Sequence, residues 1–121
     1  RGVIVVKRRG MEPDEAAVNY QKTVLNAWKE IDEALSAYAA AQQETAQLAA
    51  RTRNTAEALR LVNARYKNGL TDYTAVLDAR RRNVQAQQAL AAAQGRLNTQ
   101  FAALNKAVGN VPAGNIVAPA D

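Results

Sequence analysis

The sequence predicts an all-α protein: a long antiparallel helical hairpin of the coiled-coil type, with a short extended N-terminal arm and a loose C-terminal tail. Three observations predict this fold. Residues 14–67 contain neither Gly nor Pro, their apolar residues recur at steps of three and four, and Asn68-Gly69 is the only turn signal between Pro13 and Gly95. About a fifth of the chain, 27 of 121 residues, is alanine, the best helix former. Alanine buries little apolar area per residue, so a long helical object is favoured over a compact globule.

The N-terminal segment, residues 1–12, is predicted to be a separate arm. Residues 2–6 read GVIVV and are β-branched except for the glycine, which indicates a short strand or an irregular segment that ends at Gly10. Pro13 then precedes Asp14 and Glu15, and proline followed by acidic residues is typical of the first turn of a helix. We therefore predict a helix over residues 13–67, with a length on the order of 80 Å.

The hairpin, residues 13–109, is predicted as that first helix, a tip at 68–71 and a second helix at 72–108, with a tail at 110–121. Gly69 can take the left-handed conformation that ends a helix, and Thr71 or Asp72 can cap the next one. So short a link makes the two helices antiparallel neighbours.

Each predicted helix has a stripe of apolar residues along one face. The predicted stripe of the first helix is Val24, Trp28, Ile31, Leu35, Tyr38, Ala46 or Ala49, Ala56, Leu59, Val62 and Tyr66; few large apolar residues occur in its middle, where Gln42 and Thr52 lie near its line. The predicted stripe of the second helix is Tyr73, Leu77, Arg80, Val84, Gln87, Leu90 or Ala91, Gln94, Leu97, Phe101, Leu104 and Val108. Outward-facing parts of such stripes are expected to drive self-association into dimers or larger bundles.

The composition argues against catalysis and against a resident metal or cofactor. The chain has no Cys and no His, and Ser36 is its only serine, so it offers no nucleophile–base pair and lacks the commonest metal ligands. Its carboxylates are spread along the predicted helices instead of gathering in one place. No apolar run is long enough to form a transmembrane helix. We therefore expect a protein that is not an enzyme.

Two segments are distinctive: YQKTVLNAWKEIDEAL at residues 20–35 and ARYKNGLTDYTAVLDAR at residues 64–80. Both resemble the TolC-like outer membrane factor family, most closely the lipoprotein branch of tripartite efflux systems. The pattern RYxxGL followed by VLDA is fairly specific, whereas alanine-rich helices alone would be weak evidence. The Ala/Gln/Leu pattern extends the resemblance to about residues 14–109. The segment looks like the hairpin of the second, C-terminal repeat of such a protein.

The resemblance implies a function in export. Members of the family are trimers that form an outer-membrane barrel continued by a periplasmic helical tunnel, and each protomer contributes two hairpins. The hairpin tips form the periplasmic entrance, which gates the channel and docks a periplasmic adaptor protein that connects it to an inner-membrane pump. The expected function is thus to line and gate the entrance of a channel that exports small molecules. The expected location is the periplasmic portion of a bacterial outer-membrane protein.

The resemblance also implies roles for individual residues. The tip that contacts the adaptor corresponds to Asn68, Gly69, Leu70, Thr71 and Asp72. The pore gate corresponds to Asp78, which would form a ring of three carboxylates, and to Thr74 one turn earlier on the same face. Such a ring attracts cations, so a cation-sensitive gate is expected. Tyr66 matches a tyrosine of a latch between coils. Some members carry a second aspartate at the position of Ala75, so the ring here would hold fewer charges.

Plainer interpretations remain open for each of these residues. Asp78 could be a solvated carboxylate with Arg82 one turn away, Gly69 a simple helix terminator, and Tyr66 and Tyr73 packing residues at the end of the hairpin. The main alternative function is a free-standing coiled-coil interaction module, which would need the stripes but no specific tip. Nucleic-acid binding is disfavoured because Arg80, Arg81 and Arg82 point in different directions on a helix and no stacking aromatics interleave with them.

Overall fold

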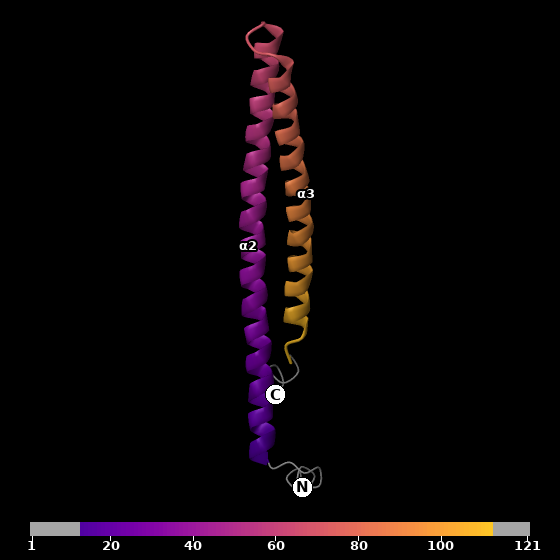
Figure 1. Ribbon diagram of the computed structural model, residues 1–121. Helices are drawn as coiled ribbons and strands as arrows, with labels where there is room; N and C mark the ends of the chain where they lie inside the picture. Colours follow the sequence, from indigo (N-terminus) through magenta and orange to yellow (C-terminus); the bar gives the residue numbers. More distant parts are fainter. Residues whose placement is uncertain (1–12, 113–121) are drawn as a thin grey trace. The chain divides into compact units, whose positions relative to one another are not determined.

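The computed structural model describes residues 13–112 and contains two helices, α2 (Pro13–Lys67) and α3 (Tyr73–Gly109). The bounds of α2 coincide with the predicted range, and α3 begins one residue later than predicted because Asp72 caps it. The predicted arm at 1–12, and the tail beyond residue 112, lie outside the described residues. The all-α hairpin predicted from the sequence is confirmed: within residues 37–102, α2 and α3 lie side by side and join at the tip (Figure 1).

The chain divides into two units, and the larger one, Ala37–Ala102, contains the tip and most of the hairpin. In this unit the two helices pack along a heptad pattern, in which residues of low exposure recur at alternating intervals of three and four. On α2 these positions are Tyr38, Ala41, Thr45, Leu48, Thr52, Thr55, Leu59 and Val62. On α3 they are Val76, Ala79, Asn83, Ala86, Leu90, Ala93, Leu97 and Gln100. We call these sixteen residues the seam. Heptad spacing of this kind is the signature of a coiled coil.

The seam is made mostly of small side chains. Val76 and Ala93 are fully buried, and Ala86 is 1% exposed. Threonines stand opposite alanines: the Thr52 hydroxyl lies 3.2 Å from the carbonyl oxygen of Ala86, while also bonding Leu48 of its own helix. The Thr45 hydroxyl lies 3.4 Å from the carbonyl oxygen of Ala93, so the same contact recurs seven residues before Thr52 on α2 and seven residues after Ala86 on α3. Because so short a side chain reaches the opposite backbone, small residues here bring the two helices close together.

A buried polar layer interrupts the apolar part of the seam. Asn83, which is 7% exposed, donates hydrogen bonds to the Thr55 hydroxyl at 3.0 Å and to the Thr52 carbonyl at 3.3 Å. Gln87 in turn donates to the Asn83 side-chain oxygen at 2.7 Å. Within residues 13–112 no buried side-chain nitrogen or oxygen lacks a partner. A polar residue at one seam position favours the register in which its partners are available, because any slip would bury it unpaired.

The smaller unit is built from residues 13–36 together with the described part of 103–121. Ala27, Ile31 and Ala107 are its buried apolar residues, and Val24, Ala34 and Leu104 are of intermediate exposure. On α2 these residues follow the same three-four spacing. Large apolar residues of this unit nevertheless lie on its surface, including Leu25, Trp28, Leu35 and Val108.

The predicted stripe of the second helix is not the face that packs on α2, so this part of the prediction is wrong. Only Leu90, Leu97 and Leu104 of that stripe have low exposure; Tyr73, Leu77, Val84, Phe101 and Val108 are 43–54% exposed. On α2 the stripe is correct at Val24, Ile31, Tyr38, Leu59 and Val62, and at Ala49 of the alternatives Ala46 and Ala49. It is wrong at Trp28, Leu35, Ala56 and Tyr66, which are exposed. The physical reason is that the hairpin packs through its smallest residues and leaves many of its largest apolar residues outside.

Candidate functional site

The tip of the hairpin, residues 68–72, has a defined backbone geometry. Gly69 has a φ of 73°, which residues with a side chain adopt at a cost. The Leu70 amide bonds the Arg65 carbonyl at 2.9 Å, and the Gly69 amide bonds the Tyr66 carbonyl at 3.0 Å. This pair of bonds is the Schellman motif, which satisfies the last carbonyls of α2. The tip is therefore fixed by α2 itself.

The start of α3 completes the turn. One side-chain oxygen of Asp72 accepts a hydrogen bond from the Ala75 amide at 3.2 Å, which identifies Asp72, and not Thr71, as the N-cap. Leu70, between the Schellman turn and this cap, is 64% exposed. The five predicted tip residues thus form one short segment that presents an apolar side chain to solvent.

Tyr66 and Tyr73 face each other across the tip, with their ring centroids 5.2 Å apart and an angle of 58° between the ring planes. Both side chains remain more than 40% exposed. The Tyr73 hydroxyl accepts a hydrogen bond from Arg80 at 3.4 Å. Within residues 13–112 Tyr66 therefore contributes to packing at the end of the hairpin, and its role in a latch between coils stays a prediction.

The predicted gate residues, Thr74 and Asp78, lie one turn apart on α3. Thr74 is exposed, whereas Asp78 is engaged by two arginines of its own helix. Arg81 forms an ion pair with one carboxylate oxygen of Asp78, and Arg82 lies 3.1 Å from the other. The sequence indicates the Arg82 contact through its spacing of four residues, and the spacing of three gives the same signal for Arg81.

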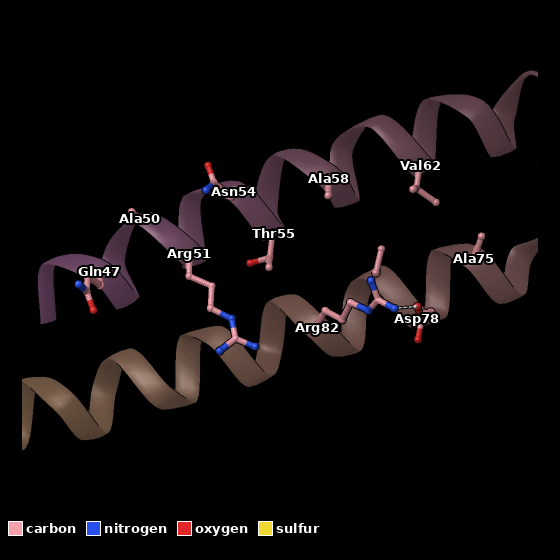
Figure 2. A pocket seen from close by; sticks show the side chains of 11 residues that line it. Gln47, Ala50, Arg51, Asn54, Thr55, Ala58, Val62, Ala75, Asp78 and Arg82 are labelled. Carbon is pink, nitrogen blue, oxygen red and sulfur yellow. Dashed lines mark ion pairs between the residues drawn. The ribbon is translucent and has the colours of Figure 1, made fainter. Parts of the chain in front are cut away.

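A groove of about 640 Å³ runs between the helices of the larger unit beside Asp78. Figure 2 shows Ala58 and Val62 of α2 opposite Ala75 of α3, with Asp78 and Arg82 along one side and Arg51 extending from α2 toward α3. The groove has an apolar floor of small residues and a charged rim. No His, Cys, Asp or Glu cluster able to hold a metal ion occurs within residues 13–112. In the same residues, no helix is both long and apolar enough to cross a bilayer.

A further ion pair, between Glu57 and Arg60, lies on the outer surface of α2, with 2.6 Å between the charged atoms. The hydrogen bond from Arg60 lowers the pKa of the Glu57 carboxyl, and the same contact raises the pKa of Arg60. Arg96 of α3 also pairs with Glu44 of α2, at 3.1 Å. These pairs are exposed and contribute little to stability.

Comparison with known proteins identifies the family. The chain is 35% identical over 68 residues to outer membrane protein OprJ of Pseudomonas aeruginosa; the matched region covers 56% of this chain but only 14% of OprJ. No solved structure matches the chain significantly. Residues 9–110 match the family described as outer membrane efflux protein, a family of transport components and not of enzymes. The chain therefore belongs to the outer membrane efflux protein family.

Proposed function

We propose that this chain is a hairpin of the periplasmic tunnel of an outer-membrane export channel, and that its tip forms part of the channel entrance. The family match over residues 9–110 and the hairpin fold support a role as part of an efflux channel. The exposed Leu70, held on a turn fixed at both ends, is the observation that carries the docking role. An apolar side chain on a rigid turn is presented to a partner with little loss of conformational entropy.

The partner proposed for the tip is a periplasmic adaptor protein that connects the channel to an inner-membrane pump. A photo-crosslinking amino acid at position 70 of the full-length protein, expressed in cells that carry its export system, tests this directly. We expect a covalent product that contains the adaptor. The matched control is position 88, where Gln88 is exposed on α3 and lies about 22 Å along the helix from its start. Equal adaptor capture from both positions, or none from position 70, would contradict docking at the tip.

The proposed conduit surface is the face of α3 that carries Thr74 and Asp78. Both side chains lie within two turns of the tip, as residues that narrow an entrance must. The small molecules that pass are not selected by a binding pocket.

Tyr66 is proposed to hold neighbouring coils closed until the adaptor docks. Mutating Tyr66→Phe, which keeps the ring contact with Tyr73 but removes the hydroxyl, is expected to increase the open probability of the full-length channel.

The proposed assembly is a trimer, in which the exposed apolar residues of each hairpin pack against other hairpins. Leu77, Val84 and Phe101 are each 45–51% exposed on α3, so they are available for such contacts. The isolated chain is expected to self-associate through the same residues. Light scattering over a range of concentrations tests this, and a strictly monomeric species at high concentration would contradict it.

A further inference from the structure

The sequence around Asp78 has an unusual charge balance. Three consecutive arginines, Arg80, Arg81 and Arg82, follow one aspartate within five residues. Arg81 and Arg82 are three and four positions after Asp78, so they share its face of α3, and each engages one oxygen of its carboxylate. The third, Arg80, lies on another face, where it donates a hydrogen bond to the Tyr73 hydroxyl. The positive charges near Asp78 therefore outnumber its single negative charge.

The sign of this local charge does not depend on how firmly the ion pairs hold. The side chains of Arg81 and Arg82 are 66% and 69% exposed, and exposed pairs exchange readily with water. Whether paired or open, however, the charges of Asp78, Arg81 and Arg82 stay on one face of α3, so a solute at that face senses their sum. That sum is net positive, at one unit per chain, and Arg80 adds a further positive charge on another face.

The same sign extends over this end of the hairpin. Residues 51–82 contain eight Lys and Arg but only three Asp and Glu, and all of them belong to the larger unit. The groove beside Asp78 is lined by Arg51 from α2 as well as by Arg82 from α3 (Figure 2). One of the three acids, Glu57, is already paired with Arg60, and another, Asp72, caps α3. The acidic residues of this segment are therefore too few to neutralise its arginines and lysines.

We infer that the entrance formed by this segment attracts anions and repels cations, and that Arg81 and Arg82 determine this preference. The inference rests on the proposed function, because it requires that Asp78 and its neighbours face a conduit. It replaces the cation-sensitive gate expected from an isolated aspartate ring. A positively charged, confined entrance raises the local concentration of anionic solutes and favours cargo that carries a carboxylate, sulfate or phosphate group.

The test is the reversal potential of the full-length protein in a planar bilayer under a KCl gradient. The wild-type channel is expected to pass chloride in preference to potassium. Arg81→Gln with Arg82→Gln removes two charges per chain and releases Asp78, so the chloride-to-potassium permeability ratio should fall by about threefold or more. Arg81→Lys with Arg82→Lys keeps the charge but not the guanidinium geometry, and it should retain the wild-type ratio.

The matched control is Arg53→Gln with Arg60→Gln, which removes the same charge from α2 and should change the ratio much less. A wild-type channel that prefers potassium, or an equal effect of both double variants, would overturn the inference while leaving the channel function intact. If purified, correctly inserted full-length protein shows no conductance, the proposed function fails instead. The two failures are therefore distinguishable.

Discussion

Helix α3 has two apolar faces between residues 73 and 102, and they differ in the size of their side chains. The face in the seam carries Val76, Ala86 and Ala93, each of which is at most 1% exposed. The neighbouring face carries Leu77, Val84 and Phe101, which are about half exposed. Leu77, Val84 and Phe101 each directly follow a seam residue, so the second face keeps the three-four spacing of the seam. The hairpin packs through the small face and leaves the large face about half exposed.

This arrangement explains why the periodicity identified the wrong face. A three-four pattern shows that a helix has a packing face, but it does not say against what that face packs. Choosing the larger residues follows the usual link between apolar area and burial, and in α3 that choice selects the outer face. The small seam is an efficient hairpin contact because two alanine-rich surfaces approach closely and allow Thr45 and Thr52 to reach carbonyls on the opposite helix.

The largest expected effect comes from enlarging a seam alanine. Ala93→Leu places three extra carbons where Ala93 is fully buried, and overpacking at such a site should lower the free energy of unfolding by about 3 kcal/mol. Ala91→Leu, two residues away and exposed, is the matched control and should change it little. Urea unfolding followed by circular dichroism measures both. Equal effects of the two variants would remove the distinction between the faces.

A smaller effect is expected from the polar layer. Asn83→Ala leaves the Thr55 hydroxyl and the Gln87 amide without their buried partner, which should cost about 1–2 kcal/mol of unfolding free energy. Asn98→Ala removes the same side chain from an exposed position of α3 and serves as the control. If the Asn83→Ala and Asn98→Ala variants had the same unfolding midpoint, the role of Asn83 in fixing the register of the helices would be contradicted.

The outer face should affect association more than folding. Leu77→Gln with Val84→Gln keeps the helix but removes apolar area that is about half exposed, so the association constant of the chain should fall about tenfold, or ~1.4 kcal/mol. Sedimentation equilibrium measures this. Unchanged association together with a large loss of stability would mean that these side chains serve the hairpin itself.

The smallest effect is expected at the exposed pair of Glu57 and Arg60. Because Arg60 lowers the pKa of Glu57 in the folded chain, any stabilisation from the pair is present at neutral pH and is lost as the pH falls through that lowered pKa. Both side chains are exposed, so Glu57→Gln should leave the thermal midpoint at pH 7 unchanged within error. A clear shift would show that this exposed pair contributes measurably to the stability of the hairpin.

Local signals predicted the ends of the helices well. Pro13 with Asp14 and Glu15 begins α2, and Gly69 ends it. Asp72 proved to be the cap of α3 that the sequence offered as one of two choices. Each of these features depends on a few adjacent residues, so no knowledge of the partner helix is needed.

Contacts between the helices were less predictable because they depend on register. The hydrogen bonds from Asn83 to Thr52 and Thr55 join residues about thirty positions apart, and only the observation that Thr52 lies near the line of the first stripe hinted at them. Arg81 beside Asp78 could have been found from its spacing of three residues. The roles of Thr74, Asp78 and Tyr66 in a gate depend on other chains, which a single sequence does not place.

The central claim is that the Thr74–Asp78 face of α3 lines a conduit, while the neighbouring face with Leu77 packs against other hairpins. The segment contains no cysteine, so single cysteines can be introduced at will into a cysteine-free version of the full-length protein. A charged thiol reagent added to the bilayer chamber is expected to reduce conductance through Asp78→Cys channels and to leave Leu77→Cys channels unaffected. Reduction of conductance at Leu77→Cys but not at Asp78→Cys would contradict the account.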